Sequence, residues 1–144
     1  MASQPEPSSS SGEIIEFVPR HLLRRDVHNL IAATTAEIPI PNMRRMLADA
    51  CTRYGSALVC ELGRSIDHGP HLTALVAIRL LLMIADAPAQ AALWQVARDE
   101  NRPPLLRLEA LRGLYQQGQE VTLAQLVELA TLAERPPPRE REMP

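Results

Sequence analysis

Histidine and cysteine are the residue types of this chain best suited to metal binding or nucleophilic chemistry. His68 and His71 flank a Gly-Pro turn and stand three residues apart, a spacing that two metal ligands could share. No cluster of Cys, Asp or Glu completes a ligand set around them. The pattern therefore favours polar turn and helix-cap residues, and we expect no metal and no cofactor.

The two cysteines, Cys51 and Cys60, lie on predicted helices with no histidine next to them in the sequence. A nucleophilic cysteine needs a neighbouring base or positive charge. Two cysteines are too few for a disulfide framework and favour small core residues in a reducing compartment. The six glycines are dispersed singly, so the sequence contains no glycine-rich phosphate loop. We therefore expect no catalytic residues, no enzyme activity and a cytoplasmic location.

The charges give no general support for binding to nucleic acid or membranes. All 15 basic residues are arginine, and 17 acidic residues bring the net charge to −2. Arginines gather in two local patches, at Arg20, Arg24 and Arg25 and at Arg44, Arg45 and Arg53. Without interleaved aromatic residues, such patches are typical of solvated helix faces. The most apolar run, residues 72–85, is too short to cross a bilayer as a helix. We expect no membrane partner.

A tryptophan and an arginine form the strongest candidate for a partner-binding site. Trp94 and Arg98 stand four residues apart and so share one face of a predicted helix. Both residue types are favoured anchors in protein interfaces. The sequence repeat described below places Arg64 at the position of Arg98 and Val127 at that of Trp94. The predicted partner-binding residues are Trp94, Arg98, Arg64, Val127 and Leu132. The alternative is that Trp94 packs between two helical hairpins.

The chain is 46% hydrophobic but only 3% aromatic, so its core must consist of Leu, Ala, Ile and Val. This composition suits close-packed helices better than strands, and we expect helices to position the residues named above. Prolines, glycines and cap residues divide it into predicted helices at residues 19–35, 42–54, 56–66, 71–85, 88–100, 104–117 and 121–134. Asn42 and Ser56 are predicted helix caps, and Thr122 and Gln125 a predicted capping box. The last six helices pair as three hairpins, and the segment 14–35 precedes them as a capping helix.

The two ends of the chain differ in composition from its middle. Residues 1–13 are rich in Ser and Pro, and residues 135–144 combine three consecutive prolines with Arg and Glu. Neither composition can build a packed core. We expect disordered tails at residues 1–13 and 135–144 and one helical domain at residues 14–134. A Pro-motif ligand is the alternative for the C-terminal segment.

A repeat of about 33 residues links the second hairpin to the third. The matched pairs are Ala77 with Ala110, Ile78 with Leu111, Leu81 with Leu114, Leu93 with Leu126, and Val96 with Leu129. The helix at residues 71–85 is apolar all round and must therefore be covered on several sides. Stacked hairpins provide that cover. The sequence thus predicts an all-α fold, a short α-solenoid of about three helical hairpins. Its predicted core includes Ile78, Leu82, Leu93, Val96, Leu111 and Leu126.

The segment from Asp99 to Leu114 resembles the HEAT-like repeat of the phycobilisome-lyase type. In that family an acidic turn leads to a helix with an Arg-x-x-Ala-Leu-x-x-Leu core, which residues 107–114 match. Residues 67–81 are a weaker copy, because Ala74 stands where the early arginine is expected. The resemblance implies an armadillo-like α-solenoid. A tetratricopeptide array is the nearest alternative, but Gln95 and Arg98 stand where that family has small or aromatic residues.

The predicted function is that of a small interaction module or scaffold, with another protein as its partner and no catalysis. A homodimer through the last predicted helix is a further expectation, because Val127 and Leu132 fall near its polar side. A fold-back of the proline-rich segment over Leu132 is the alternative to that homodimer. The alternative functions are a subunit or relative of a lyase-type HEAT-repeat enzyme and a nucleic-acid-binding helical repeat.

Overall fold

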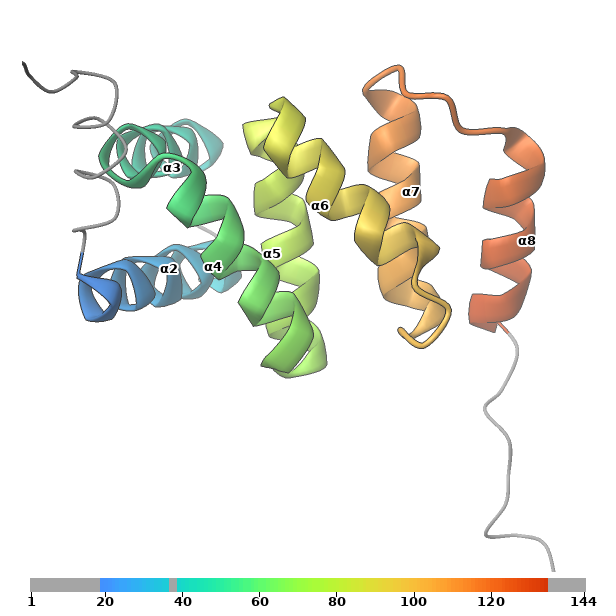
Figure 1. Ribbon diagram of the computed structural model, residues 1–144, viewed down its shortest axis with the longest axis horizontal. Helices are drawn as coiled ribbons and strands as arrows, with labels where there is room; N and C mark the ends of the chain where they lie inside the picture. Colours follow the sequence, from blue (N-terminus) through green and yellow to red (C-terminus); the bar gives the residue numbers. More distant parts are fainter. Residues whose placement is uncertain (1–18, 37–38, 135–144) are drawn as a thin grey trace, which may run out of the picture.

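The computed structural model describes residues 19–36 and 39–134, and within these ranges every regular element is a helix. The predicted all-α fold class is therefore confirmed. The helices are α2 (Arg20–Thr35), α3 (Ile40–Tyr54), α4 (Ser56–His68), α5 (His71–Ile84), α6 (Ala87–Arg98), α7 (Pro104–Gln116) and α8 (Leu123–Glu134) (Figure 1). The predicted tails at 1–13 and 135–144, and the start of the capping helix at 14–18, lie outside the described residues.

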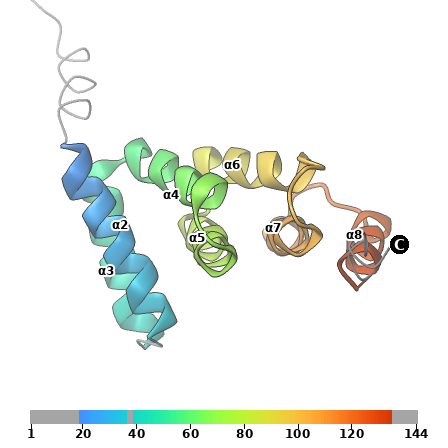
Figure 2. The same cartoon turned by 90° about the horizontal axis from the view of Figure 1, so that it is seen from below.

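The helices from α4 onward lie in two layers. Figure 2 shows α4 and α6 in one layer and α5, α7 and α8 in the other, while α2 and α3 are steeply tilted and extend past the second layer. Helices also contact the next-but-one helix in the chain, as α4 does with α6 and α5 with α7. This packing is consistent with a short helical repeat.

The repeat seen in the sequence corresponds to equivalent burial in α5 and α7. The pairs Ala77 and Ala110, Ile78 and Leu111, and Leu81 and Leu114 are all buried. The correspondence is weaker in the second helices, since Leu93 is fully buried whereas Leu126 is only partly buried. The expectation that Leu82 and Leu126 belong to the buried core is wrong, because both keep one side open.

Two predicted helix starts are corrected by the structure. The helix α3 begins at Ile40 with Pro39 as its N-cap, so Asn42 lies inside the first turn. Pro41 fits that turn because its fixed φ is helical and its missing N–H has no partner there. Ser56 is the first helical residue of α4, and Gly55 precedes it as the cap, with no side-chain cap hydrogen bond. Gly55 has a φ of 58°, which is why a single residue can join the two helices.

The predicted capping box at the start of α8 is present. The Gln125 amide N–H donates to the Thr122 hydroxyl at 3.1 Å, and the Thr122 amide N–H donates to Gln125 Oε1 at 2.9 Å. Sequence reasoning missed a comparable cap on α6, where the Ala89 N–H donates to Asp86 Oδ1 at 2.9 Å. Both caps satisfy N–H groups that have no intrahelical partner.

The helix α8 departs from the repeat. A connection of six residues, 117–122, separates it from α7, whereas residues 85–86 alone join α5 to α6. With this longer connection, α8 stands upright beside α7, whereas α6 runs obliquely from the end of α5 across α7 (Figure 1). Leu129 is accordingly its one buried residue, and Leu123, in its first turn, is 64% exposed.

A glycine sets the close approach of α5 and α7. The side chain of Leu82 lies directly over Gly113, and a methyl group added to Gly113 would clash with the end of that side chain. Any larger residue at position 113 must therefore displace Leu82 or separate the two helices. This contact is the physical reason why Gly113 stands within a helix, where glycine is otherwise unfavourable.

We predict that Gly113→Ala changes the sign of its effect when Leu82 is also replaced. In the native chain the overlap should outweigh the better helix propensity of alanine, with a net loss of about 1 kcal/mol in the free energy of unfolding. In the Leu82→Ala background the clash is absent, and the same change should stabilise by up to about 1 kcal/mol. Urea denaturation of the four proteins measures both effects. Equal effects in the two backgrounds would show that Gly113 and Leu82 are not coupled.

Candidate partner-binding surfaces

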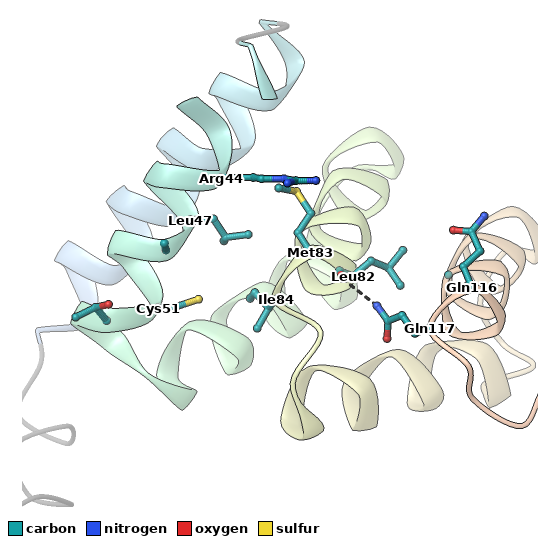
Figure 3. A pocket seen from close by; sticks show the side chains of 11 residues that line it. Arg44, Leu47, Cys51, Leu82, Met83, Ile84, Gln116 and Gln117 are labelled. Carbon is teal, nitrogen blue, oxygen red and sulfur yellow. Dashed lines mark hydrogen bonds between the residues drawn. The ribbon is translucent and has the colours of Figure 1, made fainter. Parts of the chain in front are cut away.

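A groove of about 850 Å³ lies between α3, α5 and α7. We call it the α3–α5–α7 groove. Figure 3 shows Leu47 and Cys51 pointing into it from α3, and Arg44 reaching across it toward α5. Its lining consists of Arg44, Leu47, Ala48, Cys51, Thr52, Leu82, Met83, Ile84, Gly113, Gln116 and Gln117.

The groove exists because α3 does not lie flat on its neighbours. The tilt of α3 forms one wall, while the last turns of α5 and α7 form the floor and the opposite rim (Figures 2 and 3). Gly113 presents no side chain to the floor, and Met83 remains 40% exposed there. The result is an apolar surface that is open to solvent along one side.

A glutamine fixes the rim of the groove on α7. The Gln117 side-chain amide donates to the carbonyl of Leu82 at 2.9 Å, and its Oε1 accepts from the Gln90 side-chain amide at 2.8 Å. These bonds join the end of α5 to α6 and α7, and one of them satisfies a carbonyl that the helix leaves without a partner. The floor of the groove is therefore held by hydrogen bonds as well as by apolar packing.

Among the residues that line the groove, Arg44 is the one with a charged side chain. It is exposed, and none of the ion pairs found in the described structure involves it. No carboxylate is present among the lining residues. The wall on α3 thus offers a positive charge above an apolar floor.

The thiol of Cys51 behaves as part of the apolar wall. Burial, with a smaller contribution from the negative charge of Asp86, raises the pKa of the Cys51 thiol above its usual value of 9.0. The thiol is therefore protonated at neutral pH. A thiolate, which is the reactive form of cysteine, is disfavoured at this position.

A polar cluster holds α3 against α2 and so positions the wall of the groove. The Tyr54 hydroxyl donates to Asp26, and the Arg53 guanidinium lies 3.3 Å from the same carboxylate. The hydrogen bond from Tyr54, assisted by Arg25 and Arg53, lowers the pKa of Asp26 below 3.8. Burial, together with this acceptor, raises the pKa of Tyr54.

The predicted Trp94–Arg98 pair lies at a second hollow, on the side of α6 that faces α8. The guanidinium of Arg98 lies over the indole ring, 4.5 Å from the ring centroid. The indole N–H donates to Gln119 Oε1 at 3.4 Å, and the ring is half-buried. Trp94 therefore both packs on the core and contributes to the surface.

We call this second hollow the α6–α8 cleft. It has a volume of about 570 Å³ and lies where α8 stands in the layer of α5 and α7 and not in that of α6. Its lining consists of Trp94, Ala97, Arg98, Glu100, Arg107, Leu111, Glu120, Gln125, Glu128, Leu129 and Leu132. The structure thus brings together three of the predicted partner-binding residues, Trp94, Arg98 and Leu132. Arg64 and Val127 do not line the cleft.

The remaining two predicted residues lie on other surfaces. Arg64 is exposed on α4, and Val127 is 63% exposed on the outer side of α8, one turn from the exposed Leu123. The half-buried Leu132 lines the cleft, so the large apolar residues of α8 that are exposed to another molecule are Leu123 and Val127.

Neither metal-binding groups nor membrane-spanning helices are found in the part of the chain that the structure describes. His68 and His71 are exposed at the ends of α4 and α5. Within residues 19–36 and 39–134, no group of three or more His, Cys, Asp or Glu side chains is placed to hold a metal ion. Among the same residues, no helix is both long and apolar enough to cross a bilayer. Compared with known proteins, the chain matches no family model, no curated protein and no solved structure.

Sequence reasoning missed the α3–α5–α7 groove. Its lining comes from three segments between residues 44 and 117 that share no motif, and the tilt of α3 that opens it depends on tertiary packing. One signal was present: Gly113 stands inside a predicted helix, where glycine is unfavourable and therefore indicates a packing or functional reason.

We predict that Tyr54→Phe destabilises the fold in a pH-dependent way. Because the pKa of Asp26 is lower in the folded than in the unfolded chain, its hydrogen bond stabilises the fold above about pH 4 and ceases to do so as the pH falls through the lowered pKa. Removing the hydroxyl should cost about 1–2 kcal/mol at neutral pH and much less in acid. Urea denaturation across this pH range measures the difference. Tyr115→Phe, at an exposed tyrosine, is the matched control; an equal loss at all pH values would contradict the role of Asp26.

Proposed function

We propose that this chain is a small HEAT-like repeat protein that acts in the cytoplasm as an interaction module or scaffold, without catalysis of its own. The α3–α5–α7 groove is the surface on which a segment of a partner protein binds. The proposal is supported chiefly by the composition of that groove, which joins an open apolar floor to an arginine without an ion-pair partner in the described structure.

The geometry of the groove defines the kind of segment that it fits. Apolar side chains of the partner would lie on Met83 and Ile84, and Met83 can adapt to different shapes because its side chain is unbranched. An acidic side chain of the partner would pair with Arg44. Recognition of this kind, with apolar anchors inside a polar rim, is common for helices and extended segments bound in grooves.

The HEAT-like assignment is supported by the two-layer packing and by the equivalent burial of α5 and α7. In such stacks, variable residues on the helices of one layer form an extended binding surface. The groove lies on the side of α5 and α7 that α4 and α6 do not cover (Figure 2). Its position therefore agrees with the proposed function.

A homodimer through α8 is a second proposed contact. Leu123 and Val127 stand one turn apart and are both well exposed, so two copies of α8 could bury them against each other. This contact would leave the α3–α5–α7 groove free, because α8 contributes no residue to its lining.

Photo-crosslinking in cells tests whether a partner protein binds in the α3–α5–α7 groove. A photoreactive residue introduced at Met83 should capture a partner protein, whereas the same residue at Arg64, exposed on α4, should not. Reversal of the positive charge on the α3 wall by Arg44→Glu should lower the captured amount about tenfold, which corresponds to about 1.4 kcal/mol in binding free energy.

Arg64→Glu is the matched control for the charge reversal, since Arg64 is also exposed and lies outside the groove. It should leave the captured amount unchanged. Equal capture at positions 83 and 64, or an equal loss with both reversals, would contradict binding at the groove. Absence of any captured protein at Met83 would contradict the proposed function itself.

A further inference from the structure

The α6–α8 cleft has the composition of a site for a proline-rich basic segment. It combines the chain's one tryptophan with Leu129 and Leu132 on the facing helix. Extended proline-rich segments bind to grooves lined by aromatic side chains, because such segments are already straight and lose little conformational entropy.

Carboxylates surround the apolar part of the cleft. Glu100, Glu120 and Glu128 line it, and none of the three has an ion-pair partner in the described part of the chain. The two cleft arginines already have partners within the cleft wall, because Arg98 stacks on Trp94 and the Arg107 guanidinium donates to the carbonyl of Ala97 at 2.9 Å. The cleft therefore offers an occupant three carboxylates without ion-pair partners in the described structure, against the two arginines of its lining.

The chain itself carries a segment with the complementary chemistry. Residues 135–139 are Arg-Pro-Pro-Pro-Arg, with one positive charge on either side of three prolines. We propose that this segment binds in the α6–α8 cleft of its own chain, with the prolines against Trp94 and Leu132 and the arginines beside the cleft carboxylates.

The position of the segment along the chain makes this binding possible within one molecule. It follows directly after Glu134, the last residue of α8, and Leu132 of the same helix lines the cleft. Figure 1 shows the end of α8 and the turn between α6 and α7, which carries Glu100, at the same end of the molecule. Five residues in the polyproline conformation span about 15 Å, enough to reach from one helix toward its neighbour.

Binding of this segment within its own chain would cover the end of the helical stack. The last unit of a repeat stack needs a covered or polar outer side, and α8 buries only Leu129 fully. The bound segment would supply that cover and would occupy the Trp94–Arg98 edge. Neither role depends on the proposed binding at the α3–α5–α7 groove, and purified protein alone is sufficient to test them.

The fluorescence of Trp94 provides the test, because no other tryptophan contributes to the signal. In the full chain, the triple change Pro136→Gly, Pro137→Gly and Pro138→Gly should raise acrylamide quenching of this tryptophan about twofold, since the ring loses its cover. The double change Pro5→Gly and Pro7→Gly at the other end of the chain is the matched control and should leave quenching unchanged. Circular dichroism should show equal helix content in all three proteins.

Charge reversal and a peptide provide two further readouts. Arg135→Glu with Arg139→Glu should also raise quenching, and added salt should reduce the difference from the native chain. A synthetic peptide of residues 135–144, added to the triple-glycine protein, should lower quenching in a saturable way. The same peptide with glycine in place of its three prolines should not.

Two results would overturn the inference. Equal quenching of the native and triple-glycine proteins would show that the segment does not cover Trp94. The second result is quenching of the native protein that falls as the protein concentration rises, together with a dimer in light scattering. It would show that a second copy of the chain occupies the cleft. Quenching that stays constant over about a hundredfold range of concentration supports binding within one chain.

Discussion

The burial of α5 is the constraint on which the rest of this structure depends. Val76, Ala77, Ile78, Leu80 and Leu81 are all buried, so this helix has no long polar side to present to water. It is accordingly covered by α2, α3, α4, α6 and α7. A helix that is apolar on most sides cannot be satisfied by one antiparallel partner, and the remaining helices are arranged by the need to enclose it.

The α3–α5–α7 groove forms where this enclosure is incomplete, whereas the α6–α8 cleft forms farther along the stack, between α6, α7 and α8. At the N-terminal side, α3 is tilted, and the last turn of α5 remains open above Met83 and Ile84. At the C-terminal side, the longer connection to α8 leaves Trp94 and Leu132 facing each other across an open cleft. The two surfaces therefore differ in chemistry as well as in place: the first carries one arginine and no carboxylate, and the second carries three carboxylates and two arginines.

Polar contacts set the positions of the elements that border these hollows. Asp26 and Tyr54 hold α3 on α2, and Gln117 joins the ends of α5 and α7 to α6. Arg102 pairs with Asp67, and its Nε lies 3.3 Å from the Asp99 carboxylate. It thus connects the turn after α6 to the last turn of α4. Exposed ion pairs contribute little to stability; their effect here is to fix the geometry of the turns.

The sequence by itself determined the helices, most of their ends and the equivalence of α5 and α7. Apolar periodicity, prolines and caps act locally, and a repeat such as Ala77-Ile78 over Ala110-Leu111 requires the same burial in both copies. Stacking of Arg98 on Trp94 also followed from a spacing of four residues within one helix. The tilt of α3, the position of α8 and the exposure of Leu82 and Leu123 were decided only by tertiary structure. They depend on how whole helices pack around α5 and on the length of one connection, and neither property leaves a local pattern in the residues concerned.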